Sequence, residues 1–279
     1  MLRQADLAAR ANNATEAQRV ELQAKVCDML RNLPSRDEIP AVTASRLQEI
    51  LRESLNTDNP FGPMKERIIS RFDDMAARAR QLLEGASDPW SAAVRLSAFG
   101  NILDSGIVDQ DAMDSEVASI SEDIQEYRLP PRFRERLLSA DSVGVLMDNV
   151  GEAAFDLPFL SLLASAGKTT WIGVKGGPVY DDLTLEDARR LGLDAYGELV
   201  SNENMGVGTI LELCPAPFRE RIFSSDLILS KGQANFETLV GRAPKAYYLL
   251  RCKCPVVSRA VGYPEGEYLL LDASGRPAE

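Results

Sequence analysis

The sequence predicts an α/β protein: a three-layer α/β/α, Rossmann-like domain with a mostly parallel sheet, preceded by an all-helical domain. Two observations predict this fold. Apolar residues recur at the helical period through the first half of the chain, and after Asp141 short β-rich runs alternate with helical segments. The rhythm changes at "RLPPRFRERLLSAD", so we expect a helical domain at 1–140 and an α/β domain at 141–279.

The first half is expected to form one helix after another. From Pro60 to Gly85 one face carries apolar residues at helical spacing: Met64, Ile68, Ile69, Phe72, Met75, Ala76, Ala79 and Leu83. Gly62 and Pro63 mark the start of this helix and Gly85 its end. "DPWSAAVRLSAFGNILDSG" predicts a second helix ending near Gly106, "SEVASISEDIQEY" a third, and "RLPPRFRERLLSAD" a connector with a short helix.

The second half is expected to form a sheet covered by helices. The candidate strands are "SVGVLMD", "TTWIGVK", "GELVS", "SDLILSK", "AYYLLRC" and "EYLLLDA". Between them, "GEAAFDLPFLSLLASAG" and "TLEDARRLG" have the pattern of amphipathic helices. This alternation is typical of a largely parallel sheet with helices on both faces.

Composition narrows the classes of partner. A formal net charge of -11 argues against a nucleic-acid binder, because neutralising phosphate supplies most of such a protein's affinity. No apolar run approaches the roughly 20 residues of a membrane span, and the polar N-terminal stretch is unlike a secretory signal. We therefore expect a cytoplasmic protein, without membrane or nucleic-acid partners, that binds small molecules or proteins; its oligomeric state is left open.

The residues available for catalysis are restricted. The chain has no histidine, which removes the commonest general base, the Ser-His-Asp triad and any His-liganded zinc site. Its 4 cysteines are too few and too scattered for a disulfide framework. Chemistry must rest on carboxylates, amides, lysines, hydroxyls, thiols or a metal held by oxygen.

Oxygen donors follow the ends of two predicted strands. Asp148 and Asn149 close the first strand, and the loop "KGGPVYDDLTLED" brings Asp181 and Asp182 just after the second. In such sheets ligands bind beyond the carboxyl ends of the strands, and carboxylate and amide oxygens suit Mg²⁺, Mn²⁺ or Co²⁺ better than a structural zinc. The alternative is that these residues cap the helices that follow them.

Lysines close two strands at the same predicted edge. Lys175 ends one run, and Lys231 with Gly232 begins a turn whose ammonium and N–H groups could cradle a phosphate. The alternative is an exposed turn lysine with Asn235 as a helix cap. Neither a P-loop nor a dinucleotide-binding fingerprint is present.

Three other features are less informative. Gly206 and Gly208 in "ENMGVGTI" are expected to turn the chain, although this loop could line a site. Cys252 and Cys254 alternate along a strand and are expected to be buried thiols. Asn101 and Asp104 are three apart on one helix face, where they could make an interdomain hydrogen bond or form a site wall.

Several stretches, taken in order, resemble the metal-dependent damage-control phosphatase family, formerly a domain of unknown function, in its stand-alone prokaryotic branch. They are "DPWSAAVRLSAFGNILDSG", "DNVGEAAFD", "VKGGPVYDDLTLEDA", "SDLILSKGQANFETL" and "LLRCKCPVVSRAVG". The resemblance runs from the first helix to about Asp272. It implies an α/β/α Rossmann-like domain beside a helical domain, and hydrolysis of phosphomonoesters of small metabolites such as sugar phosphates.

The resemblance also implies roles for particular residues. Asp148 and Asn149 of the "DN" pair and Asp182 of "YDD" would hold a divalent metal ion, Mg²⁺, Mn²⁺, Co²⁺ or Ni²⁺. Lys231 of "SKGQAN" would hold the substrate phosphate with Asn235 nearby. Lys175 is a further candidate for phosphate binding because of its place at the end of a strand, not because of the resemblance. Glu152 of "DNxGE" would orient the metal shell or the water. Many relatives have Asn where Asp181 stands, so either aspartate of the pair could meet the metal.

Three other functions are compatible with parts of the sequence. A haloacid-dehalogenase-like phosphatase would use Asp148 as nucleophile, but it needs a second aspartate where this chain has Val150. A methyltransferase would need a glycine-rich turn that "DNVGEA" lacks. A protein of a different class, a non-catalytic phosphometabolite-binding protein, could use the same scaffold.

Overall fold

The computed structural model describes residues 1–35, 39–100, 121, 123–252 and 255–279. Six strands form one sheet in the order β3-β2-β1-β4-β5-β6. All neighbours are parallel except β5 and β6, which are antiparallel. The strands are β1 (Ser142–Leu146), β2 (Thr169–Val174), β3 (Glu198–Ser201), β4 (Leu227–Lys231), β5 (Ala246–Arg251) and β6 (Tyr268–Leu271). Every predicted strand is confirmed.

Both faces of the sheet are buried. Successive side chains of each strand point to opposite faces, and each face packs against an apolar cluster. Val143 and Val145 of β1 belong to one apolar cluster, whereas Leu146 belongs to another. Leu229 of β4 joins the first cluster, and Ile228 joins the second. Two cores therefore lie on either side of one sheet.

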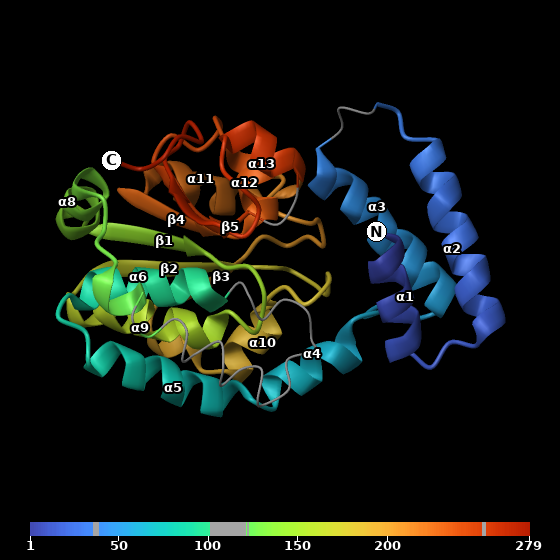
Figure 1. The fold of residues 1–279 in the computed structure, drawn as a ribbon, viewed down its shortest axis with the longest axis horizontal. Coiled ribbons are helices and arrows are strands. Elements are labelled where there is room, and N and C mark those ends of the chain that lie inside the picture. The colour runs from blue at the N-terminus through green and yellow to red at the C-terminus, as the bar shows by residue number, and fades with distance from the viewer. Residues whose placement is uncertain (36–38, 101–120, 122, 253–254) are drawn as a thin grey trace.

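Helices cover both faces (Figure 1). One layer contains α5 (Phe72–Glu84), α6 (Pro89–Phe99), α9 (Ala153–Ser165) and α10 (Leu185–Arg190). The other contains α11 (Ala216–Ser224), α12 (Gln233–Leu239) and α13 (Pro255–Val261). The short 3₁₀ turns Leu193–Ala195 and Leu211–Leu213 complete the connections. The predicted three-layer α/β/α fold with a mostly parallel sheet is confirmed.

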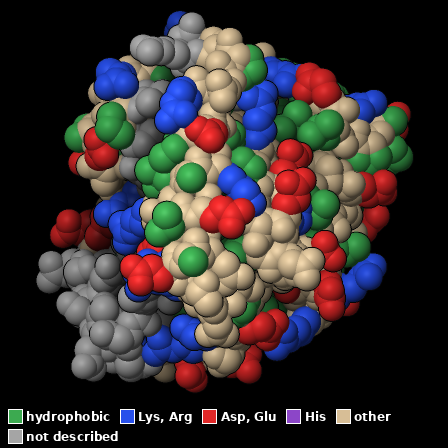
Figure 2. All heavy atoms as spheres, turned by 90° about the vertical axis from the view of Figure 1, so that its right-hand side faces the viewer, with side chains coloured by type: hydrophobic (Ala, Val, Ile, Leu, Met, Phe, Trp, Pro, Cys, Tyr) green, Lys and Arg blue, Asp and Glu red, His purple; other side chains and the backbone are tan. Residues whose placement is uncertain are grey.

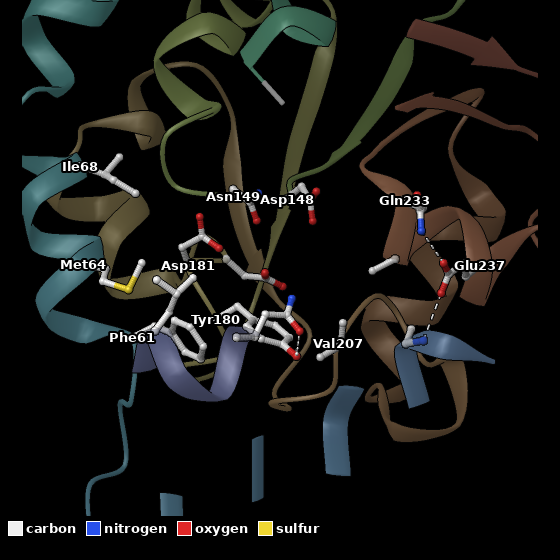
Figure 3. Close-up of a pocket in the computed structure, with 15 residues that line it drawn as sticks. Phe61, Met64, Ile68, Asp148, Asn149, Tyr180, Asp181, Val207, Gln233 and Glu237 are labelled. Carbon is white, nitrogen blue, oxygen red and sulfur yellow. Dashed lines mark hydrogen bonds between the residues drawn. The ribbon is translucent and has the colours of Figure 1, made fainter. Parts of the chain in front are cut away.

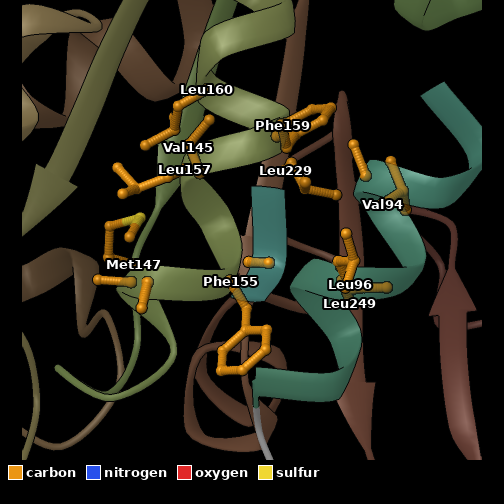
Figure 4. Packing of buried hydrophobic residues seen from close by; sticks show 14 of the residues in the cluster. Val94, Leu96, Val145, Met147, Phe155, Leu157, Phe159, Leu160, Leu229 and Leu249 are labelled. Carbon is orange, nitrogen blue, oxygen red and sulfur yellow. The ribbon is translucent and has the colours of Figure 1, made fainter. Parts of the chain in front are cut away.

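Helix α9 lies in the centre of its layer. It packs against α5, α6 and β2, and every residue from Ala153 to Leu160 is buried. A helix that is apolar all round is stable only when it is covered on all sides. Phe155 and Phe159 lie between the strands and α6 (Figure 4), and the Phe155 ring meets Phe99 edge to face. Because α5 and α6 come from the first 140 residues, this layer combines both halves of the chain; the domain boundary near residue 140 stays a prediction.

The first helices form a separate cluster. Helices α1 (Leu2–Ala11), α2 (Glu16–Arg31) and α3 (Pro40–Leu55) pack on one another beside one end of the sheet (Figure 1). Charged side chains of both signs are interspersed on the face that carries them (Figure 2). None of the described helices is long and apolar enough to span a membrane.

The stretch from Pro60 to Gly85 differs from its prediction. It forms two helices, α4 (Gly62–Ile69) and α5, instead of one. The Ser70 hydroxyl donates to the carbonyl of Arg67 at 2.8 Å, a local bond that competes with the helical pattern. The predicted start at Gly62 and end at Gly85 are confirmed. The break lets α4 turn toward the first helices while α5 stays on α9.

The remaining helical predictions have mixed outcomes. α8 (Pro131–Ser139) confirms the short helix of the connector. α6 ends at Phe99 with Gly100 as its C-cap, before the predicted end near Gly106. Asn101 and Asp104, and most of "SEVASISEDIQEY", lie outside the described residues.

Candidate active site

The two predicted groups of oxygen donors meet through backbone pairing. Asn149 and Asp182 form an isolated antiparallel bridge. Val150 N–H donates to the Asp181 carbonyl, and Leu183 N–H donates to the Asp148 carbonyl, each at 2.8 Å. Residues 33 apart in the chain are therefore held side by side by main-chain bonds, which do not depend on side-chain rotamers.

The helix-cap alternative for these residues is wrong. Helix α9 has Glu152 at its N-cap, and α10 has Thr184, which forms a capping box with Asp187. Neither Asn149 nor Asp182 is needed to start a helix. Both residues are nevertheless buried, at 6% and 5% exposure. Burying a polar group costs free energy, so helix capping does not explain why these positions are polar.

The donors lie at the switch point of the sheet. The chain leaves β1 toward β2 on one side, and β4 lies on the other side of β1. A crevice forms beyond the carboxyl ends of two such strands, and it is the usual ligand site of an open α/β sheet. Asp148 follows β1 and Gly232 follows β4 at this crevice.

A cavity of about 310 Å³ opens over these residues (Figure 3). Asp148, Asn149, Asp181 and Asp182 all line it. Tyr180, of the same loop as Asp181, also lines it, and the rest of the described lining comes from five other segments: Gln4, Leu7, Ala41, Phe61, Met64, Ile68, Val207, Gln233, Ala234 and Glu237. The N-terminal helices and α4 thus complete a site that begins at the sheet edge.

Tyr180 lies in the loop between β2 and α10 that carries Asp181 and Asp182, which we call the aspartate loop. Its backbone conformation is unusual for a residue with a large side chain. Its φ is 43°, in the left-handed region that a bulky residue rarely adopts. Its N–H donates to Gln48 Oε1 at 3.3 Å, its hydroxyl donates to Gln4 Oε1 at 3.4 Å, and its ring centroid is 5.1 Å from that of Phe61. Contacts from three N-terminal segments therefore fix the turn that presents Asp181 and Asp182.

Two buried lysines hold Asp182. Lys175 Nζ lies 3.4 Å from Asp182 Oδ2 and donates to the carbonyls of Gly206, at 2.8 Å, and Gly208. Lys65 Nζ donates to the Asp182 carbonyl at 2.6 Å and pairs with Asp187 at 2.5 Å. Lys175 is not among the residues that line the cavity, so its role as a phosphate ligand stays a prediction.

Lys65 was missed by sequence reasoning. It lies on an amphipathic helix, where a lysine ordinarily faces water, and no motif surrounds it. Its role follows from where α4 meets the aspartate loop, which is a tertiary contact. The sequence carried no signal for it.

Lys231 lies in a buried charged cluster and is not among the described residues that line the cavity. Its Nζ is 2.8 Å from Glu152 Oε2 and 2.8 Å from Asp156 Oδ1, and no side chain of the three exceeds 1% exposure. Burial alone lowers the pKa of Lys231, but Asp156 and Glu152 outweigh it and hold the pKa above its ordinary value. The lysine therefore stays an ammonium.

The same cluster differs from its sequence interpretation. The exposed-turn alternative for Lys231 is wrong because the side chain is fully buried. Its ammonium meets two carboxylates, and its direct contact with phosphate stays a prediction, as does the role of Glu152. Asp156, which the sequence did not single out, also accepts a hydrogen bond from Ser97, and its Oδ2 has no partner in the described part of the chain.

Asn235 lies within α12, whose N-cap is Gly232, so the prediction that it caps the helix is wrong. Its Nδ2 donates to the carbonyls of Lys231 at 2.8 Å and Met147 at 3.2 Å, and its Oδ1 accepts from Thr209 at 2.8 Å. Asn235 thus joins the ends of β1 and β4 to the loop after β3. Its phosphate contact stays a prediction.

Glu237 forms part of the α12 wall of the cavity. Its Oε2 accepts from the Ala41 N–H at 3.0 Å, and its Oε1 accepts from Gln233 Nε2 at 2.8 Å. Burial raises the pKa of Glu237, while these hydrogen bonds oppose the shift. Sequence reasoning missed this residue because an isolated glutamate on a short helix is ordinarily solvated.

The donor set has the chemistry of a site for a hard divalent cation. Aspartate carboxylates and the Asn149 amide supply oxygen ligands, and the cavity leaves room for water and a substrate oxygen. Over the described ranges, no three His, Cys, Asp or Glu side chains converge as a metal cluster, so a cation bound here would also need the amide oxygen of Asn149 as a ligand. The described lining contains four carboxylates and no Lys or Arg, which suits a cation better than a free anion.

The loop and cysteine predictions are partly tested. Gly208 has φ of 74° and lies against the carbonyl of Ala234, so it turns the chain as expected, while its neighbour Val207 lines the cavity. Cys252 is buried with no exposed area. Cys254 lies outside the described residues.

The chain is similar to known proteins in sequence and in fold. The chain is 29% identical over 239 residues to a damage-control phosphatase of Pyrococcus horikoshii, covering 84% of this chain and 81% of that protein. It is 30% identical over 233 residues to a damage-control phosphatase of Archaeoglobus fulgidus, covering 82% and 81%. A crystal structure of a DUF89 family protein from Pyrococcus horikoshii superposes with a TM-score of 0.83 at 26% identity, covering 98% of this chain and 95% of that one.

The family model of the damage-control phosphatase ARMT1-like domain matches residues 1–269, which includes the N-terminal helices, the aspartate loop and the cavity. The chain therefore belongs to the damage-control phosphatase ARMT1-like family.

Proposed function

We propose that this protein is a metal-dependent phosphomonoesterase that hydrolyses small phosphorylated metabolites in the cytoplasm. The observation that carries the proposal is the backbone-enforced meeting of Asp148, Asn149 and Asp182 at the switch-point cavity, in a chain whose relatives are named phosphatases. Asp148, Asn149 and Asp182 would hold Mg²⁺, Mn²⁺, Co²⁺ or Ni²⁺. Once bound, the cation would offset phosphoryl charge and lower the pKa of a bound water.

The charge of the cavity supports metal dependence. A phosphate ester would meet four carboxylates there and no Lys or Arg of the described lining. Anionic substrates are repelled by such a surface unless a cation is bound. The oxygen donors and the negative charge of the lining thus both favour a bound metal cation.

Buried residues behind the cavity lining would hold the metal ligands and the strand ends in position. Lys175 orients the Asp182 carboxylate from 3.4 Å, and Lys231 supplies a fixed ammonium one residue before Gly232. Glu152 and Asp156 hold that ammonium in place, and Asn235 fixes the strand ends around it. Preorganised charge of this kind acts without reorganisation during the reaction.

The N-terminal wall would exclude water from the leaving-group side. Phe61, Met64 and Ile68 line the cavity with apolar surface. Closure of such a site strengthens the electrostatic interactions inside it. The leaving group would occupy the space between this wall and α12.

The test is phosphate release by the purified, chelator-treated protein. A panel of sugar phosphates and p-nitrophenyl phosphate is assayed with each of the four metals, and we expect activity that appears only on metal addition. Asp182→Asn should lower kcat/KM at least about 100-fold, an effect typical of losing a main electrostatic contributor. Asp194→Asn, which changes an exposed aspartate, is the matched control. A folded protein inactive with every metal and ester would refute the proposal.

A further inference from the structure

The cavity has two unlike walls on its leaving-group side. Phe61, Met64 and Ile68 lie on one side, and Gln233 and Glu237 of α12 lie on the other (Figure 3). The phosphate of a substrate would go to the oxygen donors after β1. Its leaving group would then extend between an apolar wall and a wall that carries a carboxylate.

The Glu237 carboxylate is fixed in place. One oxygen is held by the Ala41 N–H in the first turn of α3 and the other by Gln233, at 3.0 Å and 2.8 Å. Each carboxylate oxygen can accept a further hydrogen bond, and neither can donate one while ionised. A carboxylate held this way recognises hydroxyl or ammonium groups and opposes other anions.

No described cation balances Glu237 within the cavity. The described lining has Asp148, Asp181 and Asp182 as its other charged groups. A leaving group with its own negative charge would therefore meet like charge at close range. Unfavourable contacts of this kind discriminate between ligands of the same shape.

We infer that Glu237 is a specificity-determining residue that selects phosphomonoesters with a neutral or positively charged, hydrogen-bond-donating leaving group and disfavours those with a second anionic group. The inference rests on the proposed phosphatase function and assigns part of its substrate class. It concerns the wall of the cavity formed by α12.

The experiment uses three esters on one six-carbon frame: glucosamine 6-phosphate, glucose 6-phosphate and 6-phosphogluconate, which carry a cationic, a neutral and an anionic leaving group. Both kcat/KM and inhibition of p-nitrophenyl phosphate hydrolysis are measured, so that a compound that is not turned over is still ranked by binding. The native protein should favour the first two over the third by about 10-fold or more, as one like-charge contact of about 1.4 kcal/mol would give.

Glu237→Gln removes the charge. Its one amide oxygen can still accept from the Ala41 N–H, and its NH₂ group can donate to the side-chain oxygen of Gln233 once that amide flips. The variant should reduce the preference to within about 2-fold, chiefly by improving 6-phosphogluconate. Glu220→Gln, at an exposed position of α11, changes the net charge equally and should leave the preference unchanged. Melting temperatures of both variants confirm folding.

Three results would overturn the inference. They are equal ranking of the three esters by the native protein, a Glu237→Gln variant that changes all three by one factor, and a Glu220→Gln variant with the same loss of preference. A native protein inert toward p-nitrophenyl phosphate and every other ester refutes the phosphatase proposal itself, and the inference with it.

Discussion

Gly232 passes directly over the carboxylate of Asp148. With φ of 80° and ψ of 161°, Gly232 adopts a conformation that is essentially restricted to glycine, and a Cβ at this position would collide with the Asp148 carboxyl group. The turn after β4 and the segment after β1 therefore fit together only because Gly232 has no side chain. This contact joins the two strands that flank the switch point.

The substitution Gly232→Ala should destabilise the fold and displace Asp148. We expect a loss on the order of 1–3 kcal/mol in the free energy of unfolding from the backbone alone, with a further loss of metal-dependent activity. Urea unfolding and metal titration measure the two effects. Gly241→Ala is the control, because Gly241 also has positive φ, at 73°, with nothing near its Cβ position. Equal loss of activity in both variants would count against a role of the contact.

Lys231 should be essential to the buried cluster. Lys231→Met leaves Glu152 and Asp156 without their cation, and breaking a buried pair in this way costs about 3–5 kcal/mol. Replacing the two carboxylates as well, with Glu152→Gln and Asp156→Asn, should recover much of the stability. Arg221→Gln breaks an exposed pair with Glu198 and should cost about 1 kcal/mol or less. Midpoints of denaturant unfolding measure the stability of each variant. A Lys231→Met protein as stable as the native one would contradict the prediction.

Lys65 should support the Asp182 loop. Lys65→Met removes the bond to the Asp182 carbonyl and leaves Asp187 without its buried partner. We expect the metal concentration for half-maximal activity to rise about 10-fold or more, in the range seen for groups that support metal ligands. Arg190→Gln breaks an exposed pair with Glu66, which joins α4 and α10 as the Lys65–Asp187 pair does. This variant should leave the metal concentration for half-maximal activity unchanged. The prediction fails if the two variants behave alike.

Asp88 should contribute stability that depends on pH. Burial raises the pKa of Asp88, but hydrogen bonds from Ser91 and Arg134 outweigh it and hold the pKa below 3.8, its ordinary value. A group with a depressed folded pKa stabilises fully above its unfolded pKa and loses this contribution as pH falls through the folded value. Asp88→Asn keeps a good N-cap and should cost up to about 1 kcal/mol near pH 7, because Arg134 is partly exposed.

The difference in stability between the native protein and the Asp88→Asn variant should shrink as the pH falls below about 4. Melting temperatures between pH 3 and 7 measure it. Arg134→Gln should show the same trend, because it removes the other half of the pair. A difference that stays constant across this range would refute the assignment.

The strands and the donor pairs could be predicted because their signals are local. Each strand is a short apolar run with its own ending, and Asp148 and Asn149 stand where the first run stops. Sequence order alone then places the strand ends at one edge of a parallel sheet. The break between α4 and α5 could not be read in this way, because neither Gly nor Pro marks Ser70.

The supporting residues could not be predicted because they depend on contacts between distant segments. Asp156 differs from a solvated aspartate through the approach of β4 and α6 to α9, and Glu237 differs through the approach of α3. For Lys231 the sequence did not predict the neighbours. Its motif predicts a contact with phosphate, whereas its Nζ pairs with the carboxylates of Glu152 and Asp156, and their positions in the sequence do not predict this contact.

The division of the cavity between two parts of the chain has an evolutionary consequence. The groups proposed for hydrolysis come from the loops after β1, β2 and β4, whereas α1, α3 and α4 contribute mainly to the side that would face the leaving group. Mutations at lining positions such as Met64 and Ile68 can therefore change which ester is accepted while the hydrolytic groups stay intact. In a lineage that meets new metabolic by-products, these positions and Glu237 are where adaptation should accumulate first.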